Sequence, residues 1–433
     1  MKRIRLTLCL LLFSAIATLA VAASAAAQTV VVGTGNPDID VPAVQAAVDQ
    51  GGDVMLKGHF SFDRPPTMSM DPVLPGQLAM VLVSKEVTIS GVQDDDEGEM
   101  TSIDAGTFPF FVNAPGSPVA IQGLRFVRPK GDAIWVYAVT GLVIASCRIE
   151  GVELLPTGGR EAIDIITVQN GNVPSPTNPG HPENISGRLL IVNNDIDVGG
   201  TALENTLGLL VFSVGQSPDK EVDIYVSGNT IRNTTEPAIN FHRLGGRAYI
   251  ERNVLTTGSV VGRAARPSAI RVTDLGSYLI AHNWIDCGWA RGDGEGIGVL
   301  SQFAAWPMEG AVVVDNDVTM SAPEGTVFSD FSTAIGVFGY AEGNVVRNNR
   351  IRGRARAALS VPVFLPNAPS AVPTNNAFVH NQFDDFEASV ADVFVGPTAL
   401  NTLIVGEGTV EDLGTGTIIV TRPGEREDDD KDR

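Results

Sequence analysis

Three polar residues occupy the same place in equivalent short apolar segments of the 433-residue chain, and a fourth lies two residues further along one of these segments; together they could bind and activate a carboxylate. They are Asp164 in AIDIITV, Asn240 and His242 in AINFHRL, and Arg271 in AIRVTDL. An arginine pairs with a carboxylate through two parallel hydrogen bonds. An asparagine can polarise the same group, and a histidine can take or give a proton near neutral pH. β-Elimination of a uronide needs these parts, with His242 and Arg271 as the catalytic candidates.

Three further side chains extend this candidate site. Trp135 and Tyr137 belong to the equivalent segment AIWVYAV and could stack on sugar rings, while Arg243 directly follows His242. Residues 225–275 contain seven Arg against three acidic residues, a local charge of 7 − 3 = +4. A basic region on an acidic protein is where a polyanion would bind. We therefore predict binding of an acidic polysaccharide by Trp135, Tyr137, Asp164, Asn240 and Arg243.

The segments that hold these residues alternate with a period of two, as β-strands do. A second phrase also repeats: β-branched residues, an asparagine and another apolar pair, as in LLIVNNDI, YLIAHNWI and AVVVDNDV. The aligned asparagines lie 35, 24, 30, 33, 33 and 32 residues apart; they are Asn194, Asn229, Asn253, Asn283, Asn316, Asn349 and Asn381. Cys147 takes the asparagine place one repeat earlier. Repeats of this length indicate a solenoid.

The physical interpretation is a coil of three short strands per turn, in which the turns stack about 4.8 Å apart and the strands pair in parallel. The asparagine would stand at a corner, because it tolerates the left-handed conformation and can bond to its equivalent one coil away. If the second residue of each AIxVx segment points inward, one outward column contains Trp135, Asp164, Asn240 and Arg271. The next column contains Tyr137 and His242.

With these repeats, residues 51–420 resemble the right-handed parallel β-helix of the pectin-lyase-like superfamily. The resemblance implies an all-β fold of about ten coils. Residues 28–50 would cap one end with an amphipathic helix, which has Asp40 near its N-cap and Pro42 in its first turn. In this family, ligands usually lie along the strand that follows the long loop, where the candidate residues stand.

The catalytic motifs of this family do not decide whether the protein is an enzyme. The sequence lacks the Asn-Thr-Asp and Gly-His-Gly motifs of polygalacturonase-like members, and the outward column has one carboxylate where hydrolysis requires two. Asp293 and Glu295, one coil past Arg271, would supply another. Asp164 and Arg271 match the calcium-dependent pectate lyases only in part, so Ca²⁺ is the one cofactor left open and the metal ligands are unknown. The acidic segment 94–99 is a second place for Ca²⁺, and a solvated turn is its simpler interpretation.

The alternative to a lyase-like enzyme is a non-catalytic exported surface protein or adhesin. With 50 acidic and 30 basic residues the net charge is −20, which excludes nucleic acid as a partner because such binding needs a basic surface. Cys147 and Cys287 are expected to be buried thiols rather than a disulfide framework.

The two ends of the chain differ from the repeats. Residues 1–27 have the basic start, apolar run and small-residue exit of a secretory signal peptide, and their removal would change the net charge to −20 − 3 = −23. No later segment has the roughly 18 apolar residues of a membrane span. Residues 421–433 read as a disordered acidic tail. We expect a secreted or periplasmic monomer with no membrane span after processing.

Overall fold

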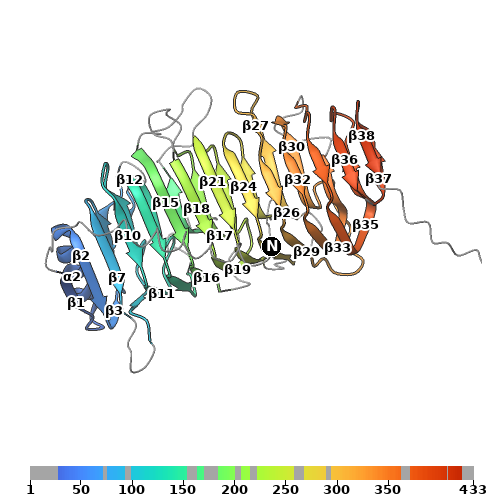
Figure 1. Cartoon of the computed structure of the whole chain (residues 1–433). Helices are drawn as coiled ribbons and strands as arrows, with labels where there is room; N and C mark the ends of the chain where they lie inside the picture. The colour runs from blue at the N-terminus through green and yellow to red at the C-terminus, as the bar shows by residue number, and fades with distance from the viewer. Residues whose placement is uncertain are drawn as a thin grey trace, which may run out of the picture.

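The computed structural model describes residues 28–71, 76–92, 99–153, 163–169, 184–199, 206–214, 222–257, 268–288, 294–361, 371–406 and 408–421. In this part of the chain, short strands wind in coils that stack along one axis, from β1 at one end to β38 at the other (Figure 1). The strands of neighbouring coils pair in parallel. The predicted signal peptide, most of segment 94–99, Asp293 and residues 422–433 lie outside the described residues.

The coil has three faces. Face 1 consists of β1 (Thr29–Val32), β2 (Gly52–Lys57), β7 (Val87–Gly91), β10 (Val119–Gln122), the end of β12 (Ile134–Ala145), β15 (Ile185–Val192), β18 (Val222–Ser227), β21 (Gly246–Glu251), β24 (Ser277–Ala281), β28 (Val312–Val314), β32 (Val345–Arg347), β34 (Ala377–Val379), β36 (Leu403–Gly406) and β38 (Ile418–Thr421). In most coils a strand of face 2 follows the strand of face 1 after a sharp corner. Face 2 consists of β3 (His59–Ser61), β8 (Ser102–Asp104), β11 (Arg125–Val127), β13 (Arg148–Glu150), β16 (Asp195–Asp197), β19 (Thr230–Thr234), β22 (Val254–Thr257), β25 (Trp284–Cys287), β29 (Asp317–Met320) and the starts of β33 (Arg350–Val361) and β35 (Gln382–Val395).

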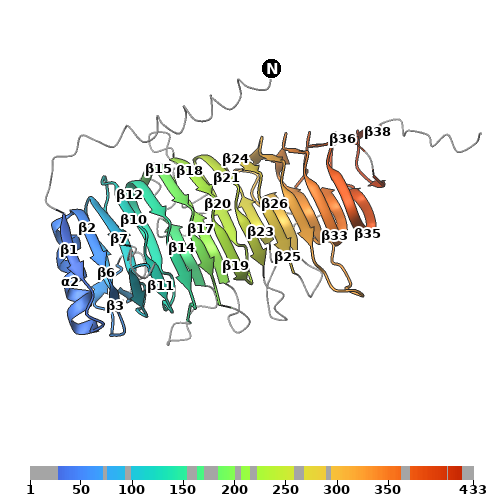
Figure 2. The ribbon, with the colours of Figure 1, turned by 60° about the horizontal axis from the view of Figure 1, so that its bottom comes forward.

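Face 3 carries the candidate site. It consists of β6 (Val81–Val83), β9 (Phe110–Asn113), the start of β12, β14 (Ile163–Gln169), β17 (Thr206–Phe212), β20 (Ile239–His242), β23 (Ser268–Thr273), β26 (Glu295–Ser301), β30 (Thr333–Gly339), the ends of β33 and β35, and β37 (Val410–Asp412). Figure 2 shows β14, β17, β20, β23 and β26 in succession along the coil. Two small pairs lie outside the faces, β4 (Met68–Ser69) with β5 (Leu78–Ala79) and β27 (Met308–Glu309) with β31 (Ala341–Glu342).

One continuous apolar core fills the inside of the coil. Alternate residues of each strand point inward, so the Ile, Val, Leu and Phe side chains of the three faces meet there and are almost fully buried. Cys147 and Cys287 are buried free thiols, as predicted, and burial raises the pKa of Cys147 to about 11. The described part of the chain has no helix that is long and apolar enough to cross a membrane.

A ladder of asparagine side chains runs along the corner between faces 1 and 2. At Asn253, the side-chain Nδ2 donates to Asn283 Oδ1 at 2.9 Å, and the backbone N–H donates to the same oxygen at 3.0 Å. Nδ2 also donates to the Val226 carbonyl, which ties three successive coils together. At the start of the ladder the Cys147 N–H donates to Asn194 Oδ1, so Cys147 does occupy the asparagine place. The predicted stacking is confirmed.

The left-handed residue of this corner is not the ladder asparagine, as the sequence suggested, but the residue before it. Asn193, Arg252, His282 and Asn348 have φ values of 55, 55, 56 and 56°. Their backbone makes the sharp turn, and the following asparagine can then direct its amide along the ladder. Arg252 is not a residue type that signals this conformation, and the residue type at this place varies between repeats, so the sequence does not reveal it.

A helix, α2 (Pro37–Gln50), covers the β1 end of the coil (Figure 1). Its N-cap is Asn36, whose side chain accepts from the Asp38 N–H, and the prediction of a helix that begins near Asp40 was therefore wrong by one turn. Asp40 is buried instead, where it accepts from the Thr34 N–H and the Ser61 N–H, each at 2.8 Å. Val44 and Val48 join the core beneath.

The helix also satisfies the exposed edge of β6. Gln45 Nε2 donates to the Leu82 carbonyl at 2.9 Å, and Gln45 Oε1 accepts from the Leu82 N–H at 2.8 Å. A strand at the end of a solenoid otherwise presents unpaired backbone groups. The amide of Gln45 replaces the missing neighbour strand, and α2 closes this end of the coil.

Candidate functional site

The outer column of face 3 has the predicted register in its central part. Leu210 pairs with Asn240, Asn240 with Arg271, and Arg271 with Gly298. In the neighbouring column Phe212 pairs with His242. Asn240 and Arg271 are therefore direct neighbours on adjacent coils.

The position of Asp164 was predicted wrongly. In β14 it is Thr167 that stands between Trp135 and Leu210. Asp164 lies three residues earlier, opposite Leu207, where it is buried and its N–H donates to Asp132 Oδ1 at 3.3 Å. The segment AIDIITV has apolar residues in two alternating registers, Ile163 with Ile165 and Ile166 with Val168, and the coil uses the second one.

Trp135 and Tyr137 are not exposed to a ligand in this structure. They are 1% and 8% exposed, and they pack in a small apolar cluster outside the coil with Met70, Phe108 and Phe111. The Phe108 ring meets Trp135 edge to face, with the ring centroids 5.9 Å apart. The stacking of a sugar on Trp135 and Tyr137 would require this cluster to open.

Arg271 is oriented by two residues from the start of its own and the next strand. Its Nη2 donates to Ser268 Oγ at 2.9 Å, and Ser268 Oγ donates to Glu295 Oε2 at 3.1 Å. Ser268 and Glu295 are register partners in β23 and β26. The Glu295 carboxylate lies over the outer surface of Gly298, since a side chain added there would begin only 2.3 Å from Oε2. Glu295 thus brings the additional carboxylate that the sequence suggested, and Gly298 leaves the space for it.

The role of Ser268 was not predicted. Its signal is positional, because it stands three residues before the outward residue of its strand. Glu295 has the same spacing to Gly298, and Asp132 has it to Trp135. Polar side chains three residues before the outward residue extend back over the outer surface of face 3.

Asn240 offers an unused acceptor beside Arg271. The residue is only 7% exposed, and no described residue donates a hydrogen bond to its Oδ1. A buried amide oxygen without a donor is unfavourable by roughly 1–3 kcal/mol, so a ligand that donates a hydrogen bond here would be favoured. The cluster of Asn240, Arg271, Ser268 and Glu295, which we call the Arg271 cluster, combines cationic donors, an amide acceptor and a carboxylate.

His242 is held as a neutral base. Burial lowers its pKa to about 3, and the neighbouring charges of Arg271 and Arg243 act in the same direction. Its ring lies against Phe212, with the centroids 5.0 Å apart. The imidazole is uncharged near neutral pH, and its low pKa makes it a weaker proton acceptor than an ordinary histidine.

Arg243 has a structural environment. Its side chain is buried, its Nε donates to Asp274 Oδ2 at 3.3 Å, and its guanidinium lies over the Trp306 ring at 4.5 Å from the centroid. The Phe303 ring lies on the same guanidinium at 5.2 Å. Burial lowers the pKa of Arg243 and raises that of Asp274, although each favours the charged form of the other. The ion pair and the rings hold Arg243 in place.

Two arginines of the basic region at 225–275 are neutralised by acidic residues outside that stretch. Arg232 pairs with Asp195 at 2.8 Å, and Arg247 pairs with Asp223 at 2.9 Å. Stacking of coils places these acidic residues beside arginines that are 24 or more positions away in the sequence. A charge count within one window therefore overstated the positive potential of this surface. Among the described residues, no group of three or more His, Cys, Asp or Glu side chains could hold a metal ion.

Comparisons with known proteins extend the description of the fold. No protein-family model matches the chain. No curated protein sequence matches it either. Several solved structures are similar, among them two that match along almost the whole coil. The surface protein and adhesin PfbA of Streptococcus pneumoniae has 13% identity, a TM-score of 0.51 and coverage of 91% of this chain and 100% of its own.

DFA-IIIase from Arthrobacter chlorophenolicus A6, in complex with GF2, has 14% identity, a TM-score of 0.51 and coverage of 90% and 97%. The fold is a right-handed parallel β-helix. The resemblance seen in the sequence is thus confirmed at the level of the fold. At these identities the similarity extends to the fold alone, and the function has to be argued from the site.

Proposed function

We propose that the protein binds a polysaccharide at the Arg271 cluster on face 3, and that the ligand is acidic. The observation that carries the proposal is the pairing of Arg271 with Asn240 on adjacent coils. Arg271 offers a guanidinium oriented by Ser268, and Asn240 offers a buried amide oxygen that can accept from a hydroxyl. A uronate presents a carboxylate and hydroxyl groups on one ring, so one residue of the pair fits each kind of group.

A finer proposal adds β-elimination. Arg271 would neutralise the uronate carboxylate, and His242 would remove the proton from the adjacent carbon. The glycosidic C–O bond of the next carbon would break as the C=C bond forms, and the leaving oxygen would take a proton from water. The low pKa of His242 works against this step, because a base that holds its proton so weakly contributes little driving force. We therefore rank binding first and elimination second, with Ca²⁺ as an additive to be tested.

The alternative is a non-catalytic surface protein or adhesin, exported through residues 1–27. One of the similar structures, PfbA, is described as a surface protein and adhesin, which supports this alternative at the level of the fold. Binding would then depend on other surfaces of the coil, and Arg271 would have no special role. Secretion, a monomeric state and the boundaries of the domains remain proposals of the same kind.

The deciding experiment measures binding of polygalacturonate, alginate and neutral dextran by calorimetry, with the wild type, Arg271→Gln and the control Arg347→Gln. Arg347 is an exposed arginine of β32 on face 1. We expect the acidic polymers alone to bind, Arg271→Gln to weaken binding by about tenfold or more, and the control to bind like the wild type. Unchanged binding by Arg271→Gln would support the adhesin alternative. Ultraviolet absorbance of unsaturated products, with and without Ca²⁺, tests elimination separately.

A further inference from the structure

The two ends of the coil differ in whether their last strand is covered. Helix α2 covers the β1 end, whereas β38 is the last described strand at the other end, and all four of its residues are exposed. Ile418, Ile419 and Val420 are 61%, 44% and 49% exposed. Ile419 stands opposite Ile404, which belongs to the core, so an inward column of the coil reaches the surface here.

A second open edge lies beside it in β35. This strand pairs with β33 along most of its length, but on its other side β37 covers only Val393–Val395. The last coil takes a shorter path, in which Thr409 follows Gly408 and bonds directly to Asp392. Among the described residues, the backbone from Gln382 to Val390 therefore has no strand on the side of the C-terminal end.

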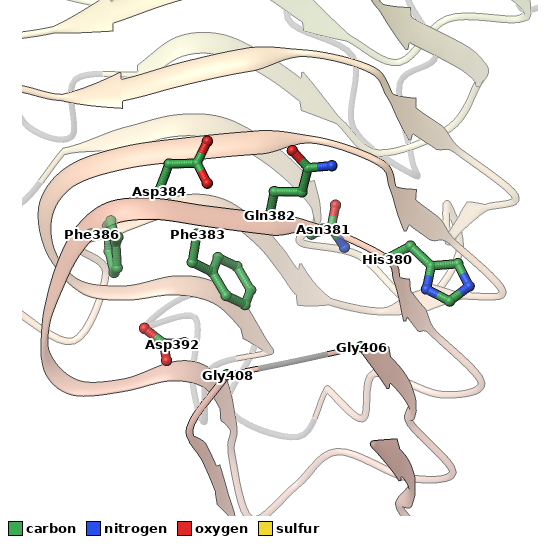
Figure 3. Close-up of a pocket in the computed structure, with 9 residues that line it drawn as sticks. All are labelled: His380, Asn381, Gln382, Phe383, Asp384, Phe386, Asp392, Gly406 and Gly408. Atoms are coloured by element: carbon green, nitrogen blue, oxygen red, sulfur yellow. The ribbon is translucent and has the colours of Figure 1, made fainter. Parts of the chain in front are cut away.

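A hollow follows this edge. It has a volume of about 560 Å³ and is lined mainly by β35 and by Gly406 and Gly408. Figure 3 shows Phe383 and Phe386 pointing into the hollow, whereas Gln382 and Asp384 extend to the opposite side of the strand. Both rings are only partly buried and pack against the end of the core. The hollow thus combines apolar side chains with an unpaired backbone edge.

The charge of this end restricts what can cover it. Residues 371–421 contain seven Asp and Glu and no Lys or Arg. Asp384 and Glu387 pair with Arg350 and Arg354 of the preceding coil, while Asp385 and Glu411 are exposed and have no cationic partner among the described residues. A second copy of this end would bring carboxylates against carboxylates. The chain's own residues 422–433 have six acidic and four basic residues, a net charge of 4 − 6 = −2, and Pro423 is their only apolar residue. They therefore match neither the acidic surface of this end nor the rings of Phe383 and Phe386.

We propose that the C-terminal end of the coil binds an extended basic segment of a partner protein by β-strand addition. The free edge of β35 supplies the main-chain hydrogen bonds. Phe383, Phe386 and Ile419 accept β-branched side chains on one side of the added strand. Asp385 and Glu411 attract Lys or Arg on the other. An exposed strand edge is a ready template for such pairing, and nothing in residues 371–421 blocks it with a lysine.

The probe is the peptide acetyl-Lys-Val-Lys-Val-Lys-Val-amide, with acetyl-Glu-Val-Glu-Val-Glu-Val-amide as its control. We expect the full chain to bind the basic peptide at least about tenfold more tightly, with the affinity falling as salt is raised. Hydrogen exchange should slow at residues 383–390 and 418–420 when the basic peptide is present. A basic peptide with proline in place of its central valine should bind weakly, because proline lacks a backbone donor.

The variant Asp385→Asn with Glu411→Gln should weaken the basic peptide about tenfold, while Glu309→Gln with Glu324→Gln, an equal charge change elsewhere, should leave it unaffected. Equal affinity for both peptides would overturn the proposal. So would a dimer of the free chain in sedimentation, since a second copy would then cover the edge. Slow exchange at 383–390 in the free monomer would also overturn it, since the chain would then cover its own edge.

Discussion

Asn283 donates from its side-chain Nδ2 to Asn316 Oδ1 at 2.9 Å, and its backbone N–H donates to the same oxygen at 3.0 Å. Both residues are 1% exposed, so water cannot replace either bond. Because the same oxygen serves two donors of the preceding coil, the loss of one asparagine side chain leaves several polar groups unsatisfied. The ladder is therefore a place where stability can be tested residue by residue.

The ladder predicts that Asn283→Ala lowers the free energy of unfolding by about 1–3 kcal/mol. Urea unfolding followed by circular dichroism measures the change. The matched control is Asn348→Gly, which removes an exposed asparagine whose φ of 56° glycine adopts freely, and it should cost less than about 0.5 kcal/mol. A loss below a few tenths of a kcal/mol in Asn283→Ala would contradict a stabilising role of the ladder.

The helical cap predicts an effect at Gln45. Gln45→Ala removes both hydrogen bonds to Leu82 and leaves the edge of β6 unpaired, which should lower the free energy of unfolding by about 1–3 kcal/mol. Gln50→Ala changes an exposed glutamine of the same helix and should have little effect. Hydrogen exchange at Leu82 should accelerate in the first variant alone. Equal stability of the two variants would argue against capping by Gln45.

The buried pair of Arg243 and Asp274 predicts a large effect of removing one partner. Arg243→Met leaves the Asp274 carboxylate buried without its cation and should cost about 3–5 kcal/mol. Adding Asp274→Asn should recover part of the loss, because an amide keeps the acceptor for the Gln302 N–H and carries no charge. Thermal and urea unfolding of the single and double variants give the comparison. A double variant no more stable than Arg243→Met would show that the pair is not the cause.

The pKa of His242 predicts a defined pH dependence of stability. The folded protein has a His242 pKa of about 3, below the value of about 6.5 of an unfolded chain. Between these values the unfolded state binds more protons, so the contribution of neutral His242 is complete above pH 6.5 and is lost as the pH falls toward 3. The slope reaches at most about 1.4 kcal/mol per pH unit.

His242→Gln should abolish this contribution. The difference in unfolding free energy between the wild type and the variant should therefore shrink as the pH falls from 7 to 4.5, whereas His380→Asn, at an exposed histidine, should follow the wild type. Urea titrations at three pH values suffice for the comparison. A constant difference over this range would mean that His242 is not held neutral by its surroundings.

The fold could be predicted from the sequence because a solenoid repeats its local constraints. The asparagines at 24–35-residue intervals indicate where each coil turns its corner, and the segments that alternate with a period of two indicate the strands. The conformation within the corner could not be predicted, since the left-handed residue varies from Asn193 to Arg252 to His282. The left-handed position accepts several residue types and therefore has no common sequence pattern, whereas the hydrogen bonds of the ladder require an asparagine amide in each coil.

The candidate site could be predicted only where the register was unambiguous. Asn240 and Arg271 are neighbours as expected, but β14 uses the second of two possible alternations, and Thr167 replaces Asp164 in the column. The cover over Trp135 comes from Phe108 and Met70, which belong to earlier loops and strands outside the repeat. Contacts between coils also decide the charge, because Asp195 and Asp223 neutralise arginines that a window of sequence counts as free.

The end of the coil that α2 covers bears on the order in which the coils fold. Each coil closes a loop of only about 24–35 residues onto the coil before it, so long-range contacts are not needed to begin. The cap precedes these coils in the chain and is therefore synthesised before them, and every later coil can use the finished one as its template. Folding can therefore proceed as vectorial growth from α2, with the open edge always at the newest coil.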